Sequence, residues 1–88
     1  MQNLGSVLGA GHRRPLIEAY ESHGLSALAA WRLAAPMTRQ VLSALSGIAI
    51  DDIARIERSE RPASPFEASQ LALCLGAEPE DLSPLVRA

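Results

Sequence analysis

Residues 37–61, MTRQVLSALSGIAIDDIARIERSER, decide the fold because they contain two short amphipathic segments separated by a single glycine. Thr38 is a favourable N-cap for a first helix, and the second helix spans about residues 50–58. Gly47 between them permits a tight turn with positive φ. The apolar side chains expected to face the core are Val41, Leu42, Leu45, Ile53 and Ile56. This stretch therefore predicts two short helices joined by a glycine turn.

On the N-terminal side, the sequence predicts an arm followed by two helices. Residues 1–14 carry several glycines and no sustained helical pattern, which indicates a flexible arm before one domain of residues 15–88. Pro15 is well placed as the first residue of a helix that His23 and Gly24 end. Ser26 suits the N-cap of the next helix. The apolar face of the Pro15 helix consists of Leu16, Ile17 and Tyr20.

On the C-terminal side, residues 64–67 (SPFE) form a capping-box pattern with proline at the first helical position. The helix that follows ends at Gly76, and Pro79 opens a last short helix. The inward-facing side chains of the helix that ends at Gly76 are expected to be Ala68, Leu71, Ala72 and Leu75. Aromatic residues are scarce, so alanine and leucine, both strong helix formers, must build the core. We predict an all-α fold.

Composition bounds the function. With 88 residues the chain forms one domain, and its single cysteine, Cys74, cannot form an internal disulfide, which favours a reducing cytoplasm. No apolar run is long enough to span a bilayer, so no membrane is expected. His12 and His23 have no acid or cysteine at ligand spacing, and no nucleophile motif or phosphate-binding glycine loop is present. We therefore expect no metal, no cofactor and no enzymatic activity.

Residues 37–61 also carry a specific resemblance. They are similar to the helix-turn-helix region of the Cro/cI (XRE) family, and the similarity extends over about residues 26–83. The positions that match the family without a gap are Met37, Thr38, Leu42, Gly47, Ile48, Ile53, Ile56, Glu57 and Arg61. The resemblance implies a small five-helix domain like that of lambda repressor, here with an additional N-terminal helical segment. It also implies binding to double-stranded DNA.

The resemblance implies roles for individual residues. Residues 49–57 would form the recognition helix in the major groove. The side chains expected to read bases are Ile50, Asp51 and Arg55. Those expected to contact phosphates are Arg39, Gln40, Arg58, Ser59 and Arg61. In relatives, the position of Arg32 often forms a buried ion pair with the position of Glu57, so we expect this pair to be structural.

The sequence departs from the family pattern at several positions. Asp51 and Asp52 stand where polar or basic side chains are usual, and the net charge is −2. These aspartates can stabilise the first turn of their helix, and one of them can also accept a hydrogen bond from cytosine. Ala49 replaces the preferred serine or threonine cap, Ser46 replaces an apolar residue, and Ser59 replaces a glycine. Alternatively, the acidic end indicates a module that contacts protein.

Three functions follow from these observations. The first is a homodimeric repressor that binds an operator, since two domains related by a twofold axis reach adjacent major grooves. The second is an antitoxin that binds both its operator and a toxin, and the third is a helical protein-interaction module. Two surfaces are candidates for the dimer contact. One consists of Leu82, Leu85 and Val86, and the other of Leu16, Ile17 and Tyr20.

Overall fold

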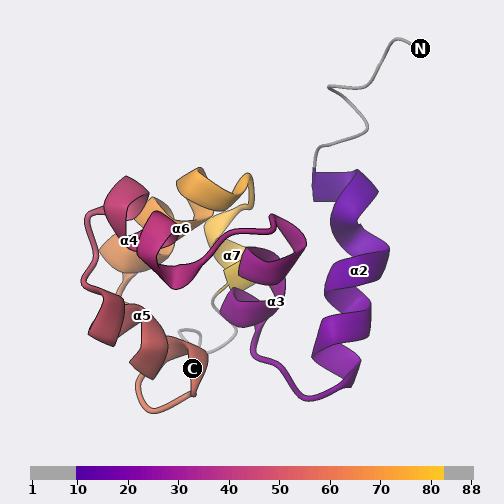
Figure 1. The fold of residues 1–88 in the computed structure, drawn as a ribbon, viewed down its shortest axis with the longest axis horizontal. Helices are drawn as coiled ribbons and strands as arrows, with labels where there is room; N and C mark the ends of the chain where they lie inside the picture. The colour runs from indigo at the N-terminus through magenta and orange to yellow at the C-terminus, as the bar shows by residue number, and fades with distance from the viewer. Residues whose placement is uncertain (1–9, 83–88) are drawn as a thin grey trace, which may run out of the picture.

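The computed structural model describes residues 10–82, and every regular element in that part of the chain is an α-helix. In chain order the helices are α2 (Ala10–Ser22), α3 (Ala27–Ala34), α4 (Arg39–Ser46), α5 (Ile50–Glu57), α6 (Pro65–Leu75) and α7 (Pro79–Leu82). Figure 1 shows α3 to α7 gathered in one body, with α2 lying along one side of it. The prediction of an all-α fold is confirmed. None of these helices is both long enough and apolar enough to cross a bilayer.

Helix α3 occupies the centre of the packing, because it contacts α2 on one side and α5 and α7 on the other. It carries Trp31, the largest fully buried side chain, and Ala30, which is also completely buried. The other large side chains that are almost completely buried are Ile17, Leu42, Ile53, Ile56, Leu71 and Leu75. Small alanines between large residues let the helices approach closely, so a chain with few aromatic residues still fills its interior.

The predicted N-caps of α3, α4 and α6 and the predicted glycine ends of α4 and α6 are confirmed. The side chains of Ser26, Thr38 and Ser64 each accept a hydrogen bond from the backbone N–H three residues further on. Ser64 also belongs to a complete capping box. Gly47 and Gly76 end their helices in the left-handed conformation, with φ of 77° and 73°. Side-chain caps at the N-termini and left-handed glycines at the C-termini satisfy backbone groups that the helices themselves leave unpaired.

The predicted start of the first helix is wrong. Helix α2 begins at Ala10, and Pro15 lies inside it. Residues 10–14, which were expected to belong to a flexible arm, are therefore helical, and residues 1–9 lie outside the described residues. Proline has no N–H to donate to the preceding turn, so this extension costs a backbone hydrogen bond.

Tertiary contacts offset that cost. The Arg13 guanidinium donates a 2.8 Å hydrogen bond from Nη2 to the carbonyl oxygen of Leu75 at the end of α6. The guanidinium carbons of Arg13 and Arg14 lie 5.8 and 5.7 Å from the centroid of the Trp31 ring. These contacts are cation–π interactions. The extra turn of α2 is thus fixed by residues that a local sequence pattern does not include.

The predicted inner face of α4 is wrong at two of its three positions. Leu42 is fully buried, but Val41 and Leu45 are 46% and 60% exposed. The helix turns Ser46 toward the core in place of Leu45. This orientation is stabilised because the Ser46 hydroxyl accepts a 3.2 Å hydrogen bond from the backbone N–H of Ile48. Burying a serine that has a hydrogen-bond partner costs little free energy. The same orientation of α4 leaves the apolar side chains of Val41 and Leu45 on the surface.

Both candidate dimer surfaces lose residues to the core of the same chain. Ile17 and Leu82 are buried within the hydrophobic core, and Tyr20 packs against it. Leu16 alone among the three α2 candidates is an exposed large side chain. The remaining candidates, Leu85 and Val86, lie outside the described residues.

Candidate nucleic-acid interface

The connection between α4 and α5 is short, and hydrogen bonds to both backbone groups of Ile48 hold it in place. Only residues 47–49 separate the helices. The buried Ile48 donates its N–H to Ser46, and its carbonyl accepts a 2.6 Å hydrogen bond from the Ser43 hydroxyl. Gly47 makes the reversal in a conformation that other residues adopt only with strain. The two helices are therefore held in one relative orientation.

Helix α5 divides into a buried and an exposed side. Ile53 and Ile56 are completely enclosed by the core. The three residues predicted to read bases, Ile50, Asp51 and Arg55, are all exposed. At 100° per residue they fall within about 140° of the helix circumference, so they share one outward-facing side. The structure brings the base-reading candidates together on one surface.

The N-terminus of α5 lacks a side-chain cap, because Ala49 at the N-cap has no hydrogen-bonding group. Asp51 and Asp52 occupy its first turn. Their negative charges interact favourably with the partial positive charge of the helix end and partly replace the missing cap. Asp51 is exposed while Asp52 is half-buried, so Asp51 is the more accessible of the two.

The C-terminus of α5 is anchored by a buried carboxylate. Glu57 accepts hydrogen bonds from Arg32 Nε at 2.5 Å and from Arg32 Nη2 at 3.1 Å. The Glu57 side chain is only 2% exposed. The remaining Nη1 of Arg32 donates to the Met37 carbonyl at 3.0 Å. This is the ion pair that the family resemblance implied, and it connects α3, the start of α4 and the end of α5.

Arg39, expected to contact phosphate, is a second partner of Glu57. Its Nε donates to Oε1 of Glu57 at 2.9 Å. The Arg39 side chain remains 43% exposed, so its terminal nitrogens are accessible beside α5. No sequence pattern predicts this contact, because Arg39 and Glu57 lie eighteen positions apart and no local motif connects them. Gln40, the neighbouring phosphate candidate, is exposed on α4.

Arg61 forms a second ion pair, between the turn after α5 and the start of α6. Its two terminal nitrogens donate to the two carboxylate oxygens of Glu67 at 2.8 Å, and Asp52 lies 3.5 Å from Nη2. These hydrogen bonds, together with one from the Ser64 backbone, lower the pKa of Glu67 to about 2. The same bonds raise the pKa of Arg61. The capping box revealed Glu67 in the sequence, but nothing there indicated its pairing with Arg61.

Arg58 and Glu60 form a third pair at the surface. Arg58 Nε donates to Glu60 Oε2 at 2.7 Å, which raises the pKa of Arg58 and lowers that of Glu60. Between them, Ser59 adopts φ of 60° and is exposed. Ser59 therefore takes the left-handed conformation at the position where the family pattern has glycine.

All three proposed phosphate-contacting arginines are thus already bonded to carboxylates. The exposed Arg55, in contrast, has no hydrogen bond or ion pair from its guanidinium to any side chain within residues 13–82. An arginine carries five N–H donors, so each paired guanidinium retains groups for a second acceptor. Within the described part of the chain, no three histidine, cysteine, aspartate or glutamate side chains come together as a metal site would require.

Comparisons of this chain with models of protein families, with curated proteins and with solved structures found no match.

Proposed function

We propose that this protein is a sequence-specific regulator of the Cro/cI helix-turn-helix type that binds duplex DNA as a homodimer and represses transcription. The observation that carries the proposal is the exposed side of α5. Ile50, Asp51 and Arg55 are presented together there, while the core holds the opposite side and Glu57 anchors the C-terminal end of the helix. A rigid helix with one free side is what reading base edges in the major groove requires.

Each exposed side chain on α5 suits a particular base. The guanidinium of Arg55, which no side chain of residues 13–82 pairs with, can donate two hydrogen bonds to O6 and N7 of guanine. The exposed Ile50 can contact a thymine methyl group, and Asp51 can accept a hydrogen bond from N4 of cytosine. Arg55 is expected to contribute most to sequence preference, because a bidentate contact to guanine is the strongest of the three.

The side chains that flank α5 suit the phosphate backbone. Arg39 and Gln40 begin α4, the helix before α5, and Arg58, Ser59 and Arg61 follow the end of α5 in the chain. Because the three arginines are paired with carboxylates, phosphate oxygens would have to share or displace those partners. We therefore expect moderate non-specific affinity that decreases steeply as the salt concentration rises.

Selection from a random duplex DNA library at physiological salt tests the proposal. The expected result is a palindrome whose half-sites lie about one helical turn apart, as a twofold dimer requires. Arg55→Ala should then weaken binding to that site by about 1–3 kcal/mol and relax the preference at one base pair. Arg14→Ala, an arginine on α2, serves as the matched control and should leave the selected site unchanged. An equal loss on every DNA sequence from Arg55→Ala would remove this residue from base reading.

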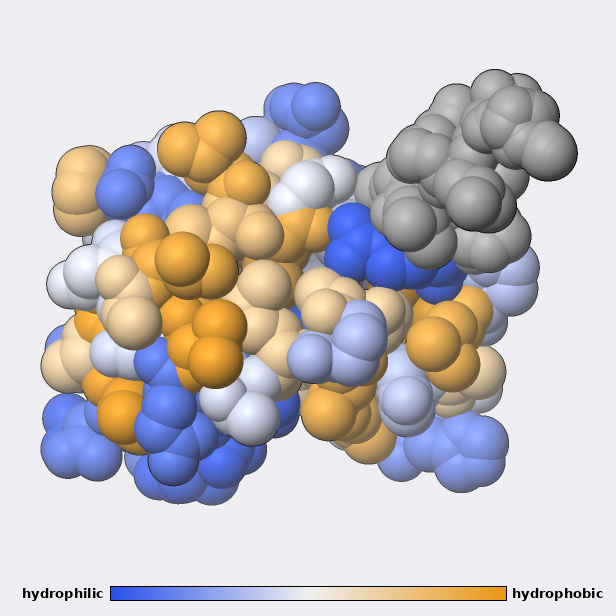
Figure 2. Space-filling model, turned by 45° about the horizontal axis from the view of Figure 1, so that its top comes forward, coloured by the Kyte–Doolittle hydropathy of each residue, from blue (hydrophilic) through white to orange (hydrophobic). Residues whose placement is uncertain are grey.

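A second candidate function is a protein-interaction module, and a specific observation favours it. Val41 and Leu45 on α4 and Phe66 and Leu73 on α6 are exposed, and these two helices contact each other. Figure 2 shows apolar surface over the part of the molecule that contains them. A folded protein that enriches no DNA sequence in the selection would support this candidate. An antitoxin would instead bind both its operator and a toxin.

A further inference from the structure

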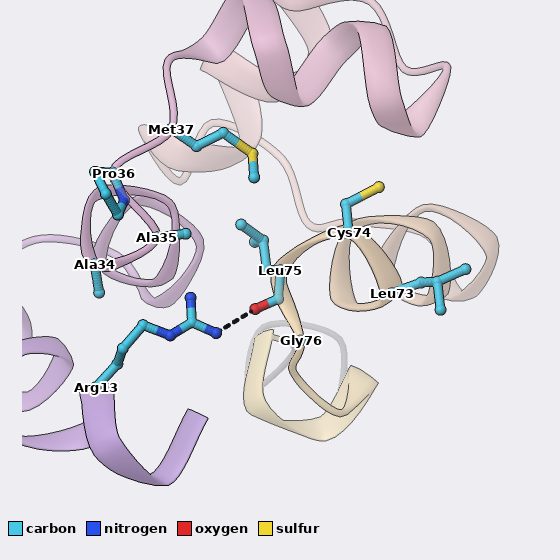
Figure 3. A pocket seen from close by; sticks show the side chains of 9 residues that line it. All are labelled: Arg13, Ala34, Ala35, Pro36, Met37, Leu73, Cys74, Leu75 and Gly76. Carbon is cyan, nitrogen blue, oxygen red and sulfur yellow. Dashed lines mark hydrogen bonds between the residues drawn. The ribbon is translucent and has the colours of Figure 1, made fainter. Parts of the chain in front are cut away.

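An open pocket of about 580 Å³ lies where three segments of the chain meet, and no residue of α5 is among those that line it. Arg13 of α2 forms one wall. Residues 34–37, at the end of α3 and the connection to α4, form the second wall, and residues 73–76, at the end of α6, form the third. Figure 3 shows these three segments around the pocket. The volume lies in the range that small-molecule sites occupy.

Among the described residues that line the pocket, Arg13 alone is charged. One terminal nitrogen of its guanidinium donates to the Leu75 carbonyl, and Figure 3 shows the other directed toward the space between Ala35, Leu75 and Met37. The Nε of Arg13 is buried without a hydrogen-bond partner. Within residues 13–82, no carboxylate forms an ion pair with this guanidinium. The pocket therefore presents a positive charge that the described part of the protein leaves without a counter-ion.

The other walls are largely apolar. Ala35 and Met37 face Leu75 across the pocket, whereas the exposed Leu73 side chain points away from it. Met37 has a flexible side chain that adapts to different ligand shapes. Burial raises the pKa of the Cys74 thiol, so this lining residue stays uncharged at neutral pH. A ligand in this pocket meets one cation and several apolar side chains among the described residues.

We propose that this pocket binds a small apolar carboxylate of the fatty-acid type. Its carboxylate would accept hydrogen bonds from Arg13, and its hydrocarbon chain would lie against Ala35, Met37 and Leu75. One guanidinium matches one carboxylate in geometry and in charge. A phosphate group carries more charge than a single arginine neutralises, and it leaves the apolar walls uncovered. This inference does not depend on DNA binding.

Titration with octanoate tests the proposal, because Arg13 lies over Trp31, the only tryptophan of the chain. The expected result is a saturable change in tryptophan fluorescence, with calorimetry of the same titration as an independent measure of binding. 1-Octanol has the same chain without the charge, and inorganic phosphate has charge without the chain. Both should bind at least about tenfold more weakly than octanoate.

Two variants and one matched control locate the site. Arg13→Gln removes the cation and should weaken octanoate binding at least about tenfold. Ala35→Leu keeps Arg13 and fills the space in front of it, so it should also abolish saturable binding. Arg14→Gln is the control, because Arg14 lies equally close to Trp31 but does not line the pocket. Circular dichroism establishes that each variant is folded.

Several results would overturn the proposal. The proposal fails if neither fluorescence nor calorimetry detects octanoate binding. It also fails if octanoate and 1-octanol bind with equal affinity. Unchanged octanoate affinity in folded Ala35→Leu would place any binding elsewhere on the protein. If Arg13→Gln does not fold, the comparison of octanoate with 1-octanol and the Ala35→Leu variant still decide the question.

Discussion

Two glutamates only three residues apart, Glu57 and Glu60, make the same contact in opposite surroundings. Each accepts a hydrogen bond from the Nε of an arginine, at 2.5 Å from Arg32 and at 2.7 Å from Arg58. The side chains of Arg32 and Glu57 are 11% and 2% exposed, whereas those of Arg58 and Glu60 are 55% and 50% exposed. Geometry alone does not distinguish these pairs, but burial does.

The difference separates structural from exchangeable charges. Because the Glu57 side chain is only 2% exposed, solvent does not readily replace a lost arginine, and its partners stabilise the fold. Glu60 can exchange its arginine for water at little cost, and Arg58 is therefore available to another anion such as phosphate. In this protein the paired state of an arginine does not exclude it from a binding surface; the exposure of its partner is the deciding property.

The largest effect is expected from breaking the buried pair. Arg32→Ala leaves Glu57 buried with only Arg39 beside it and should lower the free energy of unfolding by about 3–5 kcal/mol. Urea denaturation followed by circular dichroism measures this value. Replacing both residues with apolar ones of similar size (Arg32→Met with Glu57→Leu) should restore much of the loss, because no charge then remains buried. A loss below about 1 kcal/mol in Arg32→Ala would contradict the assignment of this pair as structural.

An intermediate effect is expected at Glu67, whose side chain is 18% exposed. Its pKa is lowered from 4.5 to about 2 by Arg61, so the stabilisation is fully present above pH 4.5 and disappears as the pH falls toward 2. At pH 7, Glu67→Gln should be less stable than the wild type by about 1 kcal/mol. Denaturation at several pH values should show this difference vanish in acid. A difference that stays constant down to pH 2 would mean that the carboxylate charge contributes nothing.

A smaller effect of opposite sign is expected at Ser59, between the residues of the exposed pair. Its φ of 60° strains a residue with a Cβ atom, and glycine removes that strain while adding entropy to the unfolded chain. Ser59→Gly should therefore raise the free energy of unfolding by about 0.5–1 kcal/mol. Ser59→Ala retains the strain and is the matched control. Equal stability of the two variants would show that the hydroxyl, and not the backbone, matters here.

The smallest effect on stability is expected at the exposed pair itself. Glu60→Gln should leave the denaturation midpoint unchanged, because both groups are solvated. If the protein binds DNA as proposed, the same variant should increase affinity for random duplex DNA by about two- to fivefold at low salt, since Arg58 loses its competing carboxylate. Binding measured by fluorescence anisotropy at two salt concentrations tests this gain. A lower denaturation midpoint in Glu60→Gln than in the wild type would show that Glu60, like Glu57, stabilises the fold.

Local sequence patterns were sufficient where the physical cause is itself local. Capping by Ser26 and Thr38 and the left-handed glycine at Gly47 each depend on a few neighbouring residues, and all three are present as predicted. The exposed position of Arg55 on α5 likewise follows from helical periodicity, once Ile53 and Ile56 are buried.

The sequence by itself thus determined the helices, their caps, the glycine turns and the inward side of α5. Tertiary structure alone decided that α2 extends past Pro15, that Val41 and Leu45 face outward, and that Arg39 and Arg61 are paired. The reason is that these features depend on residues far apart in the chain. Whether a helix survives an internal proline, which of two apolar sides it buries and which carboxylate an arginine meets are settled by the free energy of the packed molecule.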